Sequence, residues 1–121
     1  MYIVQMVVPV PVSKREQYSK WAENSARILL SYGCLEIEEI WGDYVPRGKK
    51  TDFYLAVDAE EGEEIVIQRQ VWASKEALFE AEEKMHEENA LDIEGELPFS
   101  SERIIVGCFT PFYYAKLESR S

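Results

Sequence analysis

The fold is decided by residues 2–42, which have the sequence YIVQMVVPVPVSKREQYSKWAENSARILLSYGCLEIEEIWG. Residues 2–10 are rich in β-branched and apolar side chains and are closed by Pro9 and Pro11, a pattern typical of a β-strand. Apolar side chains occupy both alternating sets of positions, so we expect both faces of this strand to be covered. A first strand is therefore predicted at the start of the chain.

A long helix is predicted to follow from Ser13. The segment from Ser13 to Glu16 has the form of a capping box, in which serine and glutamate side chains bind free backbone amides at a helix start. Gly33 can end this helix, because glycine adopts the left-handed conformation found just after many helices. The side chains expected on the buried side follow the helical repeat and are Tyr18, Trp21, Ala22, Ser25, Ile28, Leu29 and Tyr32.

The next stretch, residues 34–42, alternates apolar and acidic side chains, as a strand with one covered face does. Leu35, Ile37 and Trp41 lie on its apolar side. Glu39 falls on that same side and breaks the alternation. We therefore expect Glu39 to lie in an apolar surrounding.

The rest of the chain predicts a hairpin, a second helix and a last strand. The predicted elements are strands at 52–57 and 64–72, a helix from Ser74 to near Asn89, and a strand at 103–114. The order β-α-β-β-β-α-β predicts an α+β fold. Its expected form is a ferredoxin-like two-layer sandwich, in which an antiparallel sheet has two helices on one face.

Length and composition limit the class of protein. The 121 residues are 46% hydrophobic and 30% charged, which fits one domain over residues 1–121, with a core of about 1–114 and a tail at 115–121. No apolar run approaches the ~20 residues that span a bilayer, and the first residues do not resemble a signal peptide, so we expect a cytoplasmic protein. The net charge of −10 opposes binding to nucleic acids and anionic membranes.

No cofactor or metal is predicted. Cys34 and Cys108 have a spacing unlike that of zinc or redox motifs, and we expect reduced thiols. His86 is the only histidine, and it lies away from the apolar side of its predicted helix, so a surface position is favoured over a ligand role.

Two helices can cover only one face of the predicted sheet. The last strand nevertheless places Ile105 and Phe109 on one side and Ile104 and Val106 on the other. Apolar surface of this kind is typical of protein–protein contacts, and a second copy of the chain is the simplest partner. We therefore expect a homodimer formed through the open sheet face.

Glu39 is the candidate general acid or base. A carboxyl group in an apolar surrounding has a raised pKa and can exchange a proton. In this hypothesis Arg103 or Arg69 orients Glu39, and Trp41 forms one wall of a pocket. The alternative is that Glu39 forms a structural buried ion pair with one of these two arginines.

The candidate residues for ligand binding are Trp41, Asp43, Asp52, Arg69 and Trp72. The tryptophans, with Phe112 and Tyr113, suit an aromatic pocket for a flat organic substrate, and the structural alternative is that they belong to the core. The aspartates suit turn or strand caps as well. Further polar side chains lie on otherwise apolar strands, namely Gln5, Gln68, Gln70 and Arg103. These side chains suit a ligand pocket and a dimer interface equally well.

A family resemblance rests on short segments spread over nearly the whole chain. They are Glu39 to Pro46, Gly48, Thr51 to Phe53, Ala56-Val57, Glu63-Glu64, Trp72, Ser74 to Glu76, Pro98-Phe99, Arg103, Gly107 and Phe109. In these segments the chain resembles the uncharacterised DUF1428 family of small bacterial proteins, within the dimeric α/β-barrel superfamily. The resemblance implies a ferredoxin-like subunit whose open sheet face packs on its twin to enclose a barrel, and it implies no agreed activity.

From these patterns and the family resemblance we expect a homodimeric α/β-barrel protein that binds or transforms a small organic molecule between sheet and helices. The alternative is a non-catalytic binding or interaction module. A cofactor-independent monooxygenase or isomerase is a further alternative, which rests on fold analogy alone.

Overall fold

The computed structural model describes residues 1–91 and 95–118 of the chain. Its strands are β1 (Tyr2–Pro11), β2 (Glu36–Trp41), β3 (Glu63–Trp72) and β4 (Ile105–Phe109). Its helices are α1 (Arg15–Ser31), α2 (Phe53–Ala56) and α3 (Lys75–Glu87), with short 3₁₀ turns at Val12–Lys14 and Ser101–Arg103. None of the helices in these ranges is long and apolar enough to cross a membrane.

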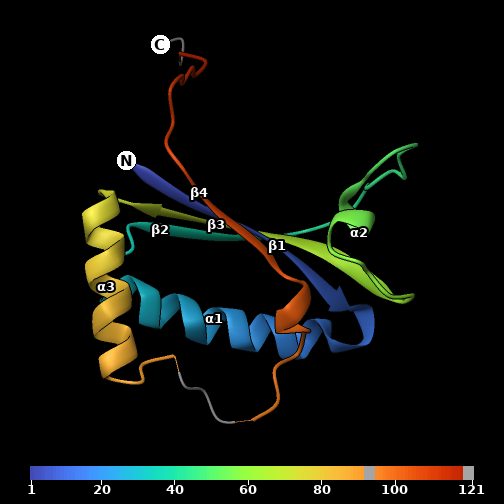
Figure 1. Cartoon of the computed structure of the whole chain (residues 1–121), viewed down its shortest axis with the longest axis horizontal. Coiled ribbons are helices and arrows are strands. Elements are labelled where there is room, and N and C mark those ends of the chain that lie inside the picture. Colours follow the sequence, from blue (N-terminus) through green and yellow to red (C-terminus); the bar gives the residue numbers. More distant parts are fainter. Residues whose placement is uncertain (92–94, 119–121) are drawn as a thin grey trace.

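The described strands form one antiparallel sheet in the order β2-β3-β1-β4. The central pair, β1 and β3, is in register from Tyr2 opposite Trp72 to Pro11 opposite Glu63. Helices α1 and α3 both lie on one side of this sheet (Figure 1). The arrangement is an α+β fold that fits a ferredoxin-like sandwich roughly, which confirms the coarse prediction.

The strand predicted at 52–57 is wrong, because Phe53–Ala56 form the one-turn helix α2. The Asp52 carboxylate accepts a hydrogen bond from the Leu55 backbone N–H at 2.8 Å, and local bonds of this kind compete with strand pairing. Helix α2 lies on the face of the sheet opposite to α1 and α3 (Figure 1). The Tyr54 hydroxyl donates to Glu64 of β3 at 2.8 Å and so ties α2 to the sheet.

The start of α1 also differs from the prediction. Pro11 is followed by a 3₁₀ turn, α1 begins only at Arg15, and no side chain caps it, so the expected capping box at Ser13 is not formed.

Two other predicted helix termini, the end of α1 and the start of α3, are confirmed. Gly33 follows α1 with a φ of +109°, and the Ser74 hydroxyl caps α3 by accepting from the Ala77 backbone N–H at 3.0 Å.

The last strand is shorter than predicted and ends at Phe109. Phe109 pairs with Ile3, close to the start of β1, so little of β1 remains for further pairing. Pro111 also has no N–H group to donate to a sheet. Residues 110–118 instead run away from the body of the molecule (Figure 1).

The apolar core on the helix-facing side of the sheet is divided into two clusters. One includes Leu29, Trp72 and Met85, between α1, β3 and α3. The other includes Val10 and Tyr18, between β1 and the first half of α1. The division matters because the candidate site lies between the two clusters.

The replacement of Asp52 by alanine should destabilise the fold through loss of the α2 cap. We expect a fall of about 2–6 °C in the midpoint of thermal unfolding followed by circular dichroism, as for a lost N-cap in a domain of this size. Asp43→Ala is the matched control, because Asp43 is an exposed residue of the same connection. Equal effects of the two substitutions would contradict the capping role.

Candidate functional site

A row of hydrogen-bonded polar side chains crosses the helix-facing side of the sheet. Trp72 Nε1 donates to Gln70 Oε1 at 2.9 Å, and Gln70 Nε2 donates to Gln68 Oε1 at 2.6 Å. Gln68 Nε2 donates to Glu39 Oε2 at 2.7 Å, and the Tyr18 hydroxyl donates to Glu39 Oε1 at 2.7 Å. We call these five residues the polar row.

Strand geometry explains the polar row. Residues 68, 70 and 72 of β3 point to the same face because side chains alternate along a strand. Gln68 lies directly opposite Glu39 of β2, which places the amide and the carboxylate side by side. Tyr18 reaches Glu39 from helix α1, so the row joins the sheet to the helix layer.

Burial affects the acid–base properties of the row. Burial raises the pKa of Glu39, while the hydrogen bonds from Tyr18 and Gln68 oppose that shift. Burial, together with the adjacent Glu39 carboxylate, raises the pKa of Tyr18 far above its usual range. The Tyr18 hydroxyl therefore stays protonated and acts as a donor to Glu39.

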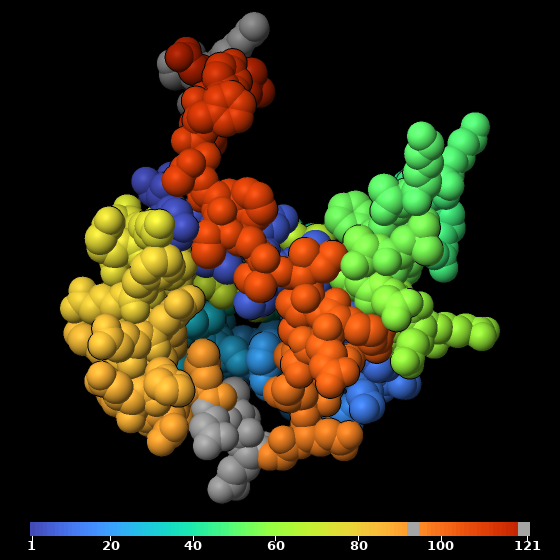
Figure 2. All heavy atoms as spheres, viewed as in Figure 1, coloured from blue at the N-terminus to red at the C-terminus, as the bar shows by residue number. Residues whose placement is uncertain are grey.

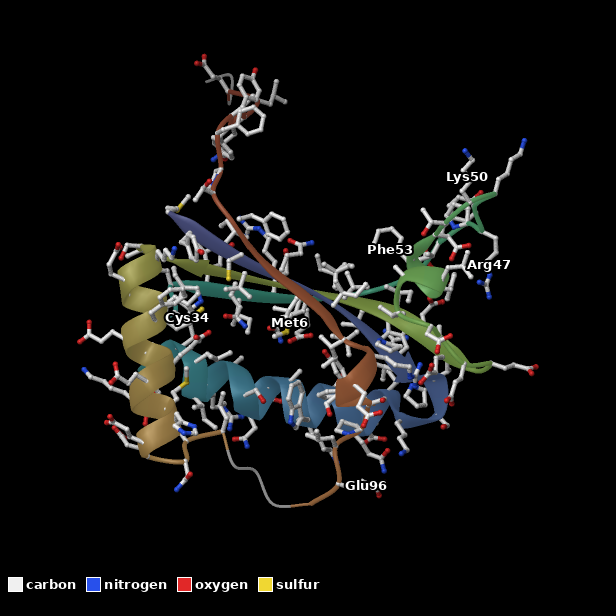
Figure 3. All side chains as sticks on the ribbon, in the orientation of Figure 1. Met6, Cys34, Arg47, Lys50, Phe53 and Glu96 are labelled. Carbon is white, nitrogen blue, oxygen red and sulfur yellow. The ribbon has the colours of Figure 1, made fainter. Side chains whose placement is uncertain are left out.

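A cavity of about 390 Å³ lies beside the polar row, between the sheet, α1, α3 and the segment before β4. Its lining is mostly apolar, and Met6 of β1 points into it from the sheet (Figure 3). The space-filling view is hollowed between α3 and the segment that leads into β4, with atoms of α1 visible inside (Figure 2). Tyr18, Gln68 and Gln70 of the polar row are among the residues that line the cavity.

Ser25 of α1 also lines this cavity. Only 4% of Ser25 is exposed, and its hydroxyl has no hydrogen-bond partner within the described ranges. Buried hydroxyls nearly always have a partner, so this one marks a position where a polar group of a ligand would fit. The helical repeat predicts only that Ser25 and Tyr18 lie on the buried side of the helix. The signal for a site is that both are polar residues among apolar neighbours.

The candidate catalytic residue Glu39 belongs to the polar row and does not line the cavity itself. The two residues that donate hydrogen bonds to it, Tyr18 and Gln68, do line the cavity. Trp72 is fully buried at the other end of the row. Trp41 is half-buried, with the Arg15 guanidinium 4.6 Å from the ring centroid, so it packs beside the second core cluster.

The expected pairing of Glu39 with an arginine is wrong. Arg103 binds both carboxylate oxygens of Glu63, at 2.6 and 2.8 Å, and the Asp58 carbonyl oxygen at 3.0 Å. Arg69 points to the opposite face of the sheet and donates to Glu36 at 3.3 Å. The reason is strand parity, since Arg69 lies between Gln68 and Gln70 and must face away from both.

The other candidates lie outside the cavity. Asp52 caps α2 and accepts from the Gly48 N–H at 3.0 Å, while Asp43 is exposed. Gln5 lies opposite Arg69 on the face away from α1 and α3. His86 is exposed, as are Phe112 and Tyr113 on the C-terminal segment, which therefore form no aromatic pocket with the tryptophans.

Within residues 1–91 and 95–118, no cluster of three or more histidine, cysteine or acidic side chains could hold a metal ion.

Fold and site together define an α+β protein with an antiparallel sheet, two helices on one face and an apolar cavity beside a buried polar row. The chain belongs to the DUF1428 family, described as proteins of unknown function, whose sequence profile matches residues 1–101. It is 39% identical over 109 residues to "Uncharacterized protein YbaA" of Escherichia coli strain K12, covering 89% of this chain and 93% of that protein. The protein of the same name from Shigella flexneri matches equally well.

A solved structure with a similar course of the chain is "De novo designed protein Foldit4". The match covers 91% of this chain and 97% of the designed chain, with 18% sequence identity and a TM-score of 0.40. A likeness at that level supports no inference about fold or function.

Breaking the Arg103–Glu63 pair should destabilise the protein in a pH-dependent way. The Glu63 and Arg103 side chains are 5% and 17% exposed, so Arg103→Met leaves a mostly buried carboxylate without its partner and should cost about 1.5–3 kcal/mol at pH 7. The hydrogen bonds from Arg103 lower the pKa of Glu63 below its usual 4.5. The stabilisation is therefore present above pH 4.5 and is lost as the pH falls through the pKa of Glu63 in the folded protein.

Urea unfolding of the wild type and Arg103→Met between pH 3 and 7 measures this effect. The double variant Arg103→Met with Glu63→Met is the control, and it should recover part of the lost stability because no charge remains unpaired. A constant difference between wild type and Arg103→Met down to pH 3 would contradict the linkage.

The two uncharged replacements of Glu39 should differ in stability. Glu39→Gln keeps two hydrogen bonds, because its carbonyl oxygen can accept from Gln68 and the Tyr18 hydroxyl can turn to accept from its amide. Glu39→Leu leaves both the Tyr18 hydroxyl and the Gln68 amide without a partner and should cost about 1–3 kcal/mol for each group left buried. Glu83→Leu on helix α3, where the side chain is exposed, should change little.

The difference in stability between the wild type and Glu39→Gln should change with pH in one direction. The pKa of Glu39 in the folded protein is raised above 4.5. Its contribution to the free energy of unfolding is therefore fully present below pH 4.5 and is lost as the pH rises through the folded pKa. Glu39→Gln should therefore gain stability relative to the wild type as the pH increases over this window, as measured by urea unfolding. A relative gain in stability of Glu39→Gln as the pH decreases would contradict a raised pKa of Glu39.

Proposed function

We propose that this protein binds a small organic molecule in the cavity between the sheet and helices α1 and α3. The observation that supports the proposal best is Ser25, a residue of the cavity lining whose buried hydroxyl has no hydrogen-bond partner among the described residues. The cavity volume of about 390 Å³ lies within the range of ligand pockets, which are mostly apolar with a few polar groups. Apolar surface that is left open in this way marks ligand-binding grooves in many proteins.

Proton transfer is the chemistry that the polar row would add if the ligand is also transformed. Glu39 would accept or release a proton through the Tyr18 hydroxyl, which lines the cavity and donates to the carboxylate at 2.7 Å. No arginine takes part in this version of the mechanism. Glu39 thus remains the proposed acid or base, one hydrogen bond behind the cavity.

We further propose that the subunit works as a homodimer through the open face of the sheet, as in a dimeric α/β barrel. Helix α2 covers one end of this face, where Ile65 is 2% exposed, but Ile40, Ile105 and Phe109 remain 45%, 41% and 56% exposed. The C-terminal segment adds further exposed large side chains, Phe112, Tyr113, Tyr114 and Leu117. A second copy would cover apolar surface of this extent, and charges of both signs on the face, Glu38 opposite Arg69, suit contact between identical surfaces.

Two neighbouring residues of β4 allow the two proposals to be tested separately. Val106 lines the cavity and pairs with Met6, whereas Ile105 pairs with Val7 and faces the open side. Both are at least 41% exposed on an edge strand, so substitutions there should be tolerated. We expect Val106→Trp to fill the cavity and Ile105→Lys to place a charge in the dimer contact.

The measurement is native mass spectrometry together with fluorescence titration by the neutral dye Nile red. Wild type should be a dimer that binds the dye; Val106→Trp should remain a dimer and bind it about tenfold more weakly, and Ile105→Lys should be a monomer that still binds it. A wild type without retained molecule or dye binding would refute the binding proposal and favour a non-catalytic interaction module. A monomeric wild type would refute the dimer.

A further inference from the structure

The cavity offers no partner for an anion. Among the described lining residues there is no lysine, arginine or histidine. A carboxylate or phosphate that leaves water needs a positive charge or several N–H donors. The amides of Gln68 and Gln70 already donate within the polar row.

Among the residues that the structure describes, the cavity also offers no buried partner for a cation. Both oxygens of Glu39 accept hydrogen bonds, from Tyr18 and from Gln68, and Glu39 is not among the described residues that line the cavity. Glu82 at the edge of the cavity is exposed to water. A buried ammonium group would therefore lose its hydration without gaining a desolvated carboxylate.

The contact point for a neutral polar group is Ser25. Its hydroxyl is both a donor and an acceptor, so it can pair with a hydroxyl, a carbonyl or an amide. Ser25 lines the cavity together with apolar side chains of the sheet, including Val4, Met6 and Val8. One hydrogen bond surrounded by apolar contacts is what such a lining can provide.

We infer that the cavity takes an uncharged, largely apolar organic molecule whose hydroxyl, carbonyl or amide group pairs with the Ser25 hydroxyl. This inference rests on the proposed function and adds the charge of the ligand and its polar contact. It excludes fatty acids and other organic anions as ligands of this cavity.

Isothermal titration calorimetry with 1-octanol and sodium octanoate at pH 7.5 tests the inference, because the two probes share a chain length and differ in charge. Wild type should bind 1-octanol at least about 30-fold more tightly than octanoate, since the carboxylate would lose its hydration without a partner. Ser25→Ala should weaken 1-octanol binding by about 2- to 12-fold, the effect of one hydrogen bond. Ser19→Ala, at an exposed position of the same helix, should leave the affinity unchanged.

The outcomes separate this inference from the proposed function. Binding of octanoate as tight as that of 1-octanol would overturn the inference on charge and would leave a ligand-binding cavity in place. Unchanged 1-octanol affinity in Ser25→Ala would overturn Ser25 as the contact. If the wild type bound neither probe, and no dye, both the inference and the proposed function would fall.

Discussion

The register of β1 on β3 is the constraint on which the rest of the structure depends. With Tyr2 opposite Trp72, the side chains of Gln68 and Gln70 face the helices, and Arg69 faces the open side. A slip of one residue would exchange the two faces, because side chains alternate along a strand. It would place an arginine beside the cavity and remove two members of the polar row. The absence of basic residues from the described lining of the cavity and the presence of charges on the open face therefore have a common origin in this one pairing.

The polar row has a direction that follows from the chemistry of its members. Trp72 can only donate, so each glutamine along β3 accepts from one side and donates to the other. Glu39 is the natural end of such a chain, because a carboxylate only accepts. Its second oxygen is then free to bind Tyr18, and this last bond links the sheet to α1 beside the cavity. The raised pKa of Glu39 results from the same position, since the bonds offset only part of the effect of burial.

Periodicity predicted which face of an element each residue occupies, and it was less informative about neighbours. The alternation in residues 34–42 placed Glu39 on the covered face, and the glutamines of β3 were recognised as polar side chains on an apolar strand. The partner of Arg103 lies 40 residues away in Glu63, a separation that no local pattern reveals. The segment at 52–57 has strand-like composition, but its aspartate cap forms local bonds that favour a helix. The unpartnered Ser25 hydroxyl required the coordinates of everything around it.

The presence of a polar row inside an apolar region is better explained by function than by stability. A hydrogen bond between buried side chains adds little net free energy of folding, and well-packed apolar residues of the same shape are often as stable. A hollow of about 390 Å³ also opposes folding, because its mostly apolar walls stay in contact with water. A sequence selected for stability alone would have filled the space between the two core clusters with larger apolar side chains. This chain instead keeps a polar row and an unpartnered hydroxyl at that place, and a bound molecule would satisfy the hydroxyl and fill the space together.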